Sequence, residues 1–220
     1  MQDTQNNIQD LRVLLRLFPD LNNVQDTHKL KIDQESLCYI TLKEDALKIT
    51  NIIYVTLKKL KIKNAVITDC TAGVGGDTIS FGRRFHKVYA FELDAKRTSI
   101  LLNNVLIYKL KNTQVFNGSC LEFIHKISDH NVVYVDPPWG GRDYKDKNKL
   151  RLSLSGIAIE DICNKLFNDK FMKKVPDIVV LKLPINYDLN FLYNKINNKN
   201  ICYYNLTRML IIVITKNRIN

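Results

Sequence analysis

The sequence lacks the long hydrophobic run that a membrane-spanning helix requires. Its longest apolar stretch near the C-terminus, Met209 to Ile214, is far shorter than the roughly 20 residues that cross a bilayer. The segment Met1 to Asp10 is polar and lacks the apolar core of a secretory signal peptide. We therefore expect a soluble, intracellular protein with no membrane partner; the sequence does not distinguish nucleus from cytoplasm.

Cysteine is scarce and lacks the spacing of a metal or disulfide site. The cysteines are odd in number and widely spread, without a C-x-x-C pair: Cys38, Cys70, Cys120, Cys163 and Cys202. This pattern argues against a disulfide framework and against zinc. We expect mostly buried thiols in a reducing compartment, and no metal. There is also no internal repeat.

Acidic residues are too few to balance the basic ones. The chain has 22 Asp and Glu against 33 Lys and Arg, which gives a formal charge of +11. Such an excess favours an anionic partner, with nucleic acid or a nucleotide polyphosphate ahead of an anionic membrane. A solvated, lysine-rich surface encoded by AT-rich DNA explains the charge equally well.

What the sequence does contain is an alternation of apolar strands and amphipathic helices. Residues 1 to 60 form a mostly helical N-terminal extension, in which Thr41 to Glu44 resembles a capping box, and residues 61 to 220 form the core. Strands are expected at residues 65–68, 88–91, 115–116, 132–135, 178–183, 201–206 and 209–215. Helices are expected between them at 78–85, 95–108, 121–127 and 157–167.

This order predicts an α/β fold with a seven-stranded, mostly parallel sheet, helices on both faces, and one strand returning antiparallel at an edge. It is the arrangement of the Rossmann-like, class I S-adenosylmethionine-dependent methyltransferases. The strand order and the oligomeric state cannot be read from the pattern, although we expect a monomer.

A glycine-rich turn at residues 69–76 follows the first core strand and opens a helix. Glycine lets the backbone approach a ligand, and the helix N-terminus offers free N–H groups. Glu92 ends the next strand, where nucleotide-binding folds hold ribose hydroxyls. Asp69 would repel a pyrophosphate but attract the ammonium of a methionine moiety. A structural turn and a strand-end acid are the alternatives. We expect S-adenosylmethionine, in contact with these further residues: Thr71, Gly73 and Gly75.

The segment Asp136-Pro137-Pro138-Trp139 follows an apolar strand and carries the strongest chemical signal. Prolines fix φ, so their carbonyls point in set directions. Such acceptors orient an exocyclic NH₂ group and stabilise the positive charge that develops during in-line methyl transfer. Trp139 offers a face for a base, with stacking worth about 1–3 kcal/mol. We predict that Asp136, Pro137 and Trp139 are catalytic; a turn whose Trp only packs in the core is the alternative.

The longer string from Pro137 to Tyr144, P-P-W-G-G-x-D-Y, resembles the trimethylguanosine synthase family, which methylates N2 of the 7-methylguanosine RNA cap. The resemblance covers about residues 12 to 215, and W-G-G-x-D-Y is its specific part. It implies m7G-capped RNA or cap nucleotides as the substrate, and 2,7-dimethyl- or 2,2,7-trimethylguanosine as the product. Further matches in order and spacing are Gly73 to Gly76, Asn103-Asn104 before Tyr108, Arg16 to Phe18, and Lys31 to Asp33 before Thr41.

The same resemblance implies roles for individual residues. N7-methylation makes guanine cationic, so Trp139 would bind it by cation–π attraction. In the family the extension helps to close over cofactor and cap, a role transferred here to Thr41 and Arg16. Basic residues between 142 and 151 would meet the cap triphosphate, although a solvated loop explains them equally well. The expected substrate contacts are Pro138, Trp139, Arg142, Tyr144, Lys145, Lys182 and Arg16.

Three positions depart from the family pattern. Asp136 stands where the family usually has Ser, as in adenine-N6 enzymes. Ser119 stands where an Asp is common near the cofactor adenine. Ile185 replaces an Arg, and Lys182 would substitute for its phosphate contact. Together with the residues of the glycine turn, the expected cofactor contacts include Ser119, Asp136 and Thr41.

Two other functions stay open. The first is an adenine-N6 methyltransferase acting on RNA or DNA, which would capture an unpaired adenine through Asp136 to Trp139. The second is a non-catalytic RNA-binding subunit with a methyltransferase-like fold. The Gly140-Gly141-x-Asp143-Tyr144 string and the matching N-terminal extension argue against the first function. Against the second argue Asp69, Gly73, Glu92 and Asp136.

Overall fold

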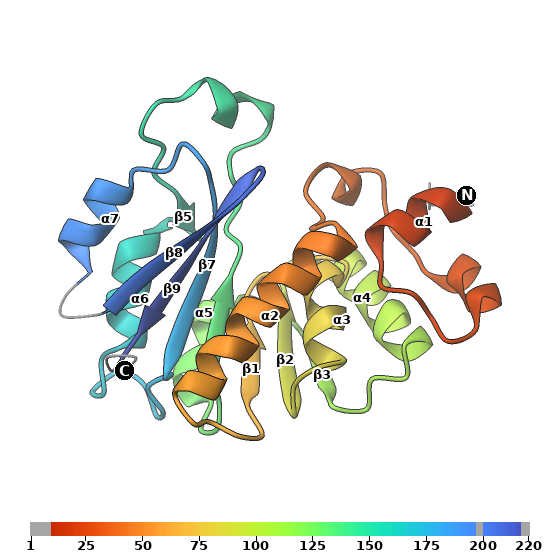
Figure 1. Ribbon diagram of the computed structural model, residues 1–220, viewed down its shortest axis with the longest axis horizontal. Helices are drawn as coiled ribbons and strands as arrows, with labels where there is room; N and C mark the ends of the chain where they lie inside the picture. The colour runs from red at the N-terminus through yellow and green to blue at the C-terminus, as the bar shows by residue number, and fades with distance from the viewer. Residues whose placement is uncertain (1–9, 197–199, 217–220) are drawn as a thin grey trace.

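The computed structural model describes residues 10–196 and 200–216, which form an α/β fold around one twisted sheet (Figure 1). The seven strands of the sheet lie in the order β3-β2-β1-β4-β7-β9-β8. The five strands from β3 to β7 are parallel to one another, as predicted. The strand bounds are β1 (Val66–Asp69), β2 (Lys87–Glu92), β3 (Thr113–Asn117), β4 (Val132–Val135), β7 (Ile178–Pro184), β8 (Asn200–Leu206) and β9 (Met209–Thr215).

The antiparallel strand lies one place in from the edge, not at the edge as predicted. β9 pairs antiparallel with β7 on one side and with β8 on the other. All seven residues of β9 are buried, whereas residues 202–205 of β8 are exposed. An apolar strand needs cover on both sides, so the more polar β8 takes the edge.

Successive strand residues point to opposite faces, so the sheet divides the core into two layers. Val133 and Val135 pack with one layer of helices, while Val132 and Tyr134 pack with the other. The first layer contains α5 (Cys120–Phe123), α6 (Ile159–Leu166) and α7 (Leu189–Lys195). The second contains α2 (Lys43–Lys59), α3 (Gly76–Gly82) and α4 (Ala95–Ile107).

The N-terminal part packs on this second layer, at the right of Figure 1. It contains α1 (Leu11–Leu17) and 3-10 helices at Val24–Lys29 and Ser36–Cys38. Leu14, Leu17 and Phe18 are buried against α3 and α4. Helix α2 packs directly on the sheet and shares its apolar cluster. Residues 10–60 and the core are therefore joined by continuous packing.

The capping box expected at Thr41 to Glu44 does not form. Leu42 is the N-cap residue of α2, and no side chain caps that helix. The Thr41 hydroxyl instead donates to Asp77, at 2.6 Å. A tertiary hydrogen bond has therefore replaced the local one.

Two predicted helices are shorter than expected. Ile157–Ala158 forms β6, which pairs with β5 (Ser153–Leu154), so α6 begins only at Ile159. The hairpin turns at Ser155 and Gly156, whose φ angles of 51° and 78° fit a two-residue turn. The helix expected at 121–127 is α5 followed by a 3-10 turn at Ile124–Lys126, and another 3-10 turn spans Arg142–Asp146.

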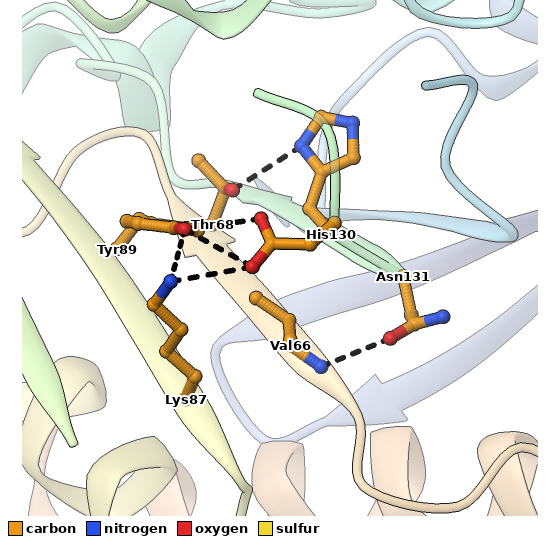
Figure 2. Close-up of polar contacts among 7 residues, drawn as sticks. Val66, Thr68, Lys87, Tyr89, His130 and Asn131 are labelled. Atoms are coloured by element: carbon orange, nitrogen blue, oxygen red, sulfur yellow. Dashed lines mark hydrogen bonds and ion pairs between the residues drawn. The ribbon is translucent and has the colours of Figure 1, made fainter. Parts of the chain in front are cut away.

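The parallel strands begin at one edge of the sheet, the amino edge, which polar side chains tie together (Figure 2). Asn131 Oδ1 accepts a hydrogen bond from the Val66 N–H at 3.0 Å. The Asp129 carboxylate accepts from Tyr89 at 3.0 Å and pairs with Lys87 at 3.2 Å. These contacts are structural, and in open α/β sheets ligands bind at the opposite, carboxyl edge.

Within the described residues, no helix is long and apolar enough to cross a membrane.

We expect Asn104→Ala to destabilise the fold, because this fully buried side chain joins the N-terminal part to α4 and the glycine turn. Its amide donates to the carbonyls of Lys31 and Val74, each at 2.9 Å, and accepts from the Lys31 N–H at 2.9 Å. Losing these partners should lower the free energy of unfolding by about 2–4 kcal/mol, measured by urea denaturation. Asn103→Ala, which removes a more exposed amide bonded to the Lys29 carbonyl, is the control and should cost less than about 1 kcal/mol. Equal losses in the two variants would contradict this account.

Candidate active site

The glycine turn after β1 has one open position and one packed position. Gly73 has φ +54°, and a Cβ built on it would meet nothing within 4 Å. Gly75 has φ +104°, and its Cβ would lie 2.8 Å from a methyl group of Leu101. A ligand can therefore approach the backbone at Gly73. The glycine at position 75 is required by packing and backbone conformation, so its predicted cofactor contact is not needed to explain it.

Glu92 lies beside this open position, at the end of β2. Its carboxylate accepts from the Gly73 N–H at 2.8 Å and from the Asp94 N–H at 2.9 Å. The Glu92 carbonyl accepts from the Gly118 N–H at 2.9 Å, which holds Ser119 at the same edge. The structure thus brings Gly73, Glu92 and Ser119 together at the carboxyl ends of β1, β2 and β3, where a nucleoside binds in such folds.

Asp69 is buried under the turn. Its oxygens accept from the Thr78 hydroxyl at 2.6 Å and from the Thr71 N–H at 3.2 Å. Burial raises the pKa of Asp69 to about 7, although the hydrogen bond from Thr78 acts in the opposite direction. Asp69 therefore holds the turn in place and presents almost no exposed surface to a ligand.

A buried ion pair lies at the end of β4. Lys182 of β7 is 3% exposed, and its ammonium lies 2.6 Å from Asp136 Oδ2 and 2.8 Å from the Thr41 hydroxyl. That hydroxyl donates to Asp77 Oδ2, which also accepts from the Tyr134 hydroxyl at 2.9 Å. One hydrogen-bonded chain therefore links β7, β4, α3 and Thr41, which lies two residues before the start of α2.

The Asp136–Lys182 pair keeps its charges at neutral pH. Burial raises the pKa of Asp136 to about 6, and the ammonium of Lys182 opposes a larger rise. Burial alone would lower the pKa of Lys182, but Asp136 and Asp77 outweigh it, so the pKa of Lys182 lies above its usual value. Asp136 and Lys182 are thus an ionised pair. With Asp77 nearby, and with Asp69 partly ionised at its pKa of about 7, the carboxylates carry more charge than the single ammonium.

This negative cluster tests the fit of the expected cofactor. S-adenosylmethionine carries a sulfonium and an ammonium, and both are favoured near excess carboxylate. A nucleotide pyrophosphate would be repelled there. The open backbone at Gly73 and the Glu92 carboxylate complete a set that fits S-adenosylmethionine.

The segment after β4 is held from two sides. The Thr71 hydroxyl accepts from the Asp136 N–H at 2.8 Å, so the turn after β1 orients the turn after β4. Pro137 is buried and Pro138 is exposed. Trp139 is half-buried, with Tyr144 edge-on at 5.1 Å and the Lys182 ammonium 5.5 Å from its ring centroid. The indole therefore lies directly beside the ion pair.

The basic loop that follows is fixed by Asn186. Its amide donates to the carbonyls of Tyr144 at 2.7 Å and Lys147 at 2.6 Å. Tyr144 thereby keeps its place against Trp139, while Lys145 is exposed. The side chain of Arg142 is outside the described part of the structure.

The structure gives different surroundings to three predicted site residues: Lys182, Arg16 and Thr41. Lys182 is buried in the ion pair, so its ammonium does not face solvent as a triphosphate contact would require. Arg16 is exposed on α1, whose buried residues pack with Val74 of the glycine turn. Thr41 is buried and reaches the site through Asp77 and Lys182.

Sequence reasoning missed Asp77, Tyr134 and the function of Asn186. Asp77 lies in the first turn of α3, where an acid is ordinary, and Tyr134 reads as one more apolar strand residue. For Lys182 a signal was present. A lysine within an otherwise apolar, fully buried strand requires a buried acid, because an unpaired charge there is costly.

Among the described residues, no group of three or more His, Cys, Asp or Glu side chains could hold a metal ion. All five cysteines are free, and Cys70, Cys120 and Cys163 are buried.

Comparisons with known proteins agree with this geometry. A family model described as RNA cap guanine-N2 methyltransferase matches residues 64–217. An uncharacterized protein of Acanthamoeba polyphaga mimivirus is 33% identical over 232 residues, covering 96% of this chain and 88% of that protein. The trimethylguanosine synthase of Schizosaccharomyces pombe is 28% identical over 146 residues, covering 63% of this chain and 59% of the yeast protein.

Solved structures show the fold. A putative methyltransferase of Escherichia coli superposes with a TM-score of 0.53 at 17% identity, over 76% of this chain and 83% of that one. The family match spans every strand of the central sheet and both turns of the site. The chain therefore belongs to the RNA cap guanine-N2 methyltransferase family and is an S-adenosylmethionine-dependent methyltransferase.

Proposed function

We propose that the protein methylates the exocyclic N2 amine of the 7-methylguanosine RNA cap. The observation that carries this proposal is the ionised carboxylate of Asp136 beside the half-buried indole of Trp139, at the carboxyl edge of the sheet. An acceptor and an aromatic face in this arrangement suit a flat, cationic base with an amine at its edge. The family match and the resemblance of the Pro137 to Tyr144 string support guanine as that base.

In this proposal the chain orients the amine and balances its charge. The bound cofactor supplies the electrophilic methyl group. The Asp136 carboxylate and the Pro137 carbonyl accept the two N–H groups, so the nitrogen lone pair points along the line of transfer. Asp136 also stabilises the positive charge that develops on the nitrogen. No strong base is needed, because the alkylated amine is acidic and loses its proton readily.

Lys182 would act as a positioning residue for this step. Its ammonium holds Asp136 Oδ2 at 2.6 Å and opposes the rise in pKa that burial produces. The other carboxylate oxygen is then left to accept from the substrate. Through Thr41, the same ammonium ties the start of α2 to the site.

A second candidate is an adenine-N6 methyltransferase. It is favoured by the carboxylate of Asp136, since the same acceptor pair can bind the N6 amine of an adenine. An adenine is neutral, however, and gains less from a cluster with excess carboxylate than a cationic base does.

The first test compares labelled methyl transfer from S-adenosylmethionine to m7GTP, GTP and an adenine-containing oligonucleotide. We expect labelling of m7GTP, with GTP at least tenfold poorer because it lacks the cationic ring. Labelling of the oligonucleotide alone would assign the enzyme to the adenine class.

Trp139→Ala should reduce kcat/KM for m7GTP by roughly fivefold to more than 100-fold, because base stacking is worth about 1–3 kcal/mol. Cofactor affinity, measured by calorimetry, should change little. Trp139→Phe keeps an aromatic face and should retain part of the activity. A large loss of cofactor affinity in Trp139→Ala would remove Trp139 from the base-binding role.

The pH profile of kcat/KM tests Lys182. We expect activity to fall as pH drops through about 6, because Asp136, with its pKa of about 6, becomes protonated and can no longer accept two hydrogen bonds. Lys182→Met removes the ammonium that keeps this pKa from rising further. The low-pH fall of the kcat/KM profile, its acid limb, should therefore move to higher pH. Asp136→Asn should abolish that limb.

Lys87→Met is the matched control, since it breaks the Lys87–Asp129 pair at the opposite edge of the sheet (Figure 2). Its profile should match the wild type. A Lys182→Met enzyme that is folded but has an unmoved acid limb would exclude the positioning role. An acid limb that persists in Asp136→Asn would assign it to another group.

A further inference from the structure

The positive charge of the chain is concentrated at one end of the molecule. The segments that lead into the parallel strands, together with the residue after β9, hold 14 lysine and arginine residues and three aspartates. Their excess of eleven equals the formal charge of +11 of the entire chain. We call this set the amino-edge surface: residues 58–64, 83–87, 109–112, 125–131 and 168–177, and Lys216.

These segments form one continuous edge, because backbone hydrogen bonds connect them in series. Backbone carbonyls at the start of β1 accept hydrogen bonds from N–H groups in the segments before β2 and β4. A carbonyl in the segment before β3 accepts a hydrogen bond from β2. In the same way, backbone hydrogen bonds join the segment before β4 to the segment before β7, and that segment to the residue after β9. The bonds are His86 N–H to Ala65 at 3.1 Å, Asn131 N–H to Val66 at 2.8 Å, Val88 N–H to Asn112 at 2.9 Å, Asp177 N–H to Asn131 at 2.9 Å, and Lys216 N–H to Asp177 at 3.1 Å.

The acids on this surface neutralise little of its charge. Asp129 pairs with Lys87 at 3.2 Å and Asp177 with Lys174 at 4.0 Å. Figure 2 shows the first of these pairs within the structural contacts of the edge. Several lysines of the surface are exposed to solvent: Lys58, Lys59, Lys61, Lys63, Lys109, Lys111, Lys126, Lys170, Lys173 and Lys216.

The rest of the chain has no net formal charge, and its carboxyl edge holds the buried acids of the site. The net positive charge of the protein therefore lies at the amino edge, whereas the carboxyl edge combines the buried acids of the site with the basic loop at residues 142–151. Crowded like charges repel one another, and a bound polyanion relieves that repulsion and releases its own counterions. Charge complementarity thus points to a polyanion as the occupant.

We propose that the amino-edge surface binds the phosphate backbone of the substrate RNA, several nucleotides away from the methylated base. This inference rests on the proposed function, which makes a capped RNA the polyanion that the enzyme meets. The two edges are separated by the length of β7, whose seven residues span about 23 Å. In a helically stacked strand one phosphate stands about every 3.4 Å of the axis, so roughly seven stacked nucleotides bridge that distance. A cap nucleotide alone cannot reach the surface.

The experiment compares m7GTP, a capped 5-mer and a capped 20-mer as substrates at several salt concentrations. The wild type should show a lower KM for the 20-mer than for the two shorter substrates, and only the 20-mer should benefit strongly from low salt. A triple variant should raise the KM of the 20-mer roughly tenfold or more at low salt, and lower its salt slope by about 2. It should leave m7GTP kinetics unchanged. Its substitutions are Lys63→Gln, Lys111→Gln and Lys173→Gln.

A matched triple variant removes the same charge from the N-terminal part of the chain. Its three residues are exposed and belong to surface ion pairs with Asp10, Asp26 and Asp45, which contribute little to stability. It should resemble the wild type with all three substrates. Its substitutions are Arg12→Gln, Lys29→Gln and Lys48→Gln.

Binding of a labelled, uncapped 20-mer, measured by anisotropy, separates this inference from the proposed function. If m7GTP is not methylated, the proposed function fails, yet the amino-edge variant should still lose RNA affinity and the matched variant should not. Equal RNA affinity and equal KM in all three proteins would overturn the inference, and so would equal losses in the two variants. Tighter binding to anionic lipid vesicles than to RNA would also overturn it.

Discussion

The buried ammonium of Lys182 is the constraint on which the site depends. A charge that is 3% exposed at the centre of a sheet is tolerated only when acids surround it, and here Asp136, Asp77 and Asp69 do so. The contacts of this one ammonium fix three residues relative to β7: Asp136 after β4, Thr41 just before α2 and, through Thr41, Asp77 in the first turn of α3. The same contacts set the ionisation of Asp136. The residues that hold this edge together are therefore the same residues that set the ionisation of Asp136. Replacing any one of them would alter both the packing of the edge and that ionisation.

The opposite edge shows what happens when charge is not compensated internally. There the lysines extend into solvent, so each costs little by itself, and the sum is a broad positive field. Within the site at the carboxyl edge the charges are few and buried, which makes each interaction stronger. The first arrangement is suited to a long polyanion held loosely, and the second to a small cation held in one orientation. A capped RNA carries both, as a cationic base at the end of an anionic chain.

The sequence predicts what is encoded locally. Apolar runs located every strand of the sheet, the glycine turn located the open backbone at Gly73, and the Asp-Pro-Pro-Trp string located the end of β4. Contacts between distant positions were not accessible. Thr41 has the appearance of a helix cap, yet its partner Lys182 is 141 positions away, and the bond was decided by tertiary packing. The order of the last two strands followed from burial on both sides, which periodicity alone does not reveal.

The ion pair also explains how an Asp can occupy position 136 in a member of the RNA cap guanine-N2 methyltransferase family. A neutral hydroxyl could accept a hydrogen bond from the amine without any charge to compensate. A buried carboxylate needs a cation, and Lys182 provides it from β7. The pair adds no net charge, so the negative field that favours a cationic base comes from Asp77 and Asp69 behind it. Asp136 and Lys182 then form one unit: in the proposed reaction the acid would orient the amine, and the lysine keeps the acid ionised. Replacing the acid alone would leave a buried ammonium beside Trp139, which would repel a cationic base. The two residues must therefore change together, and the proposed preference for 7-methylguanosine depends on both.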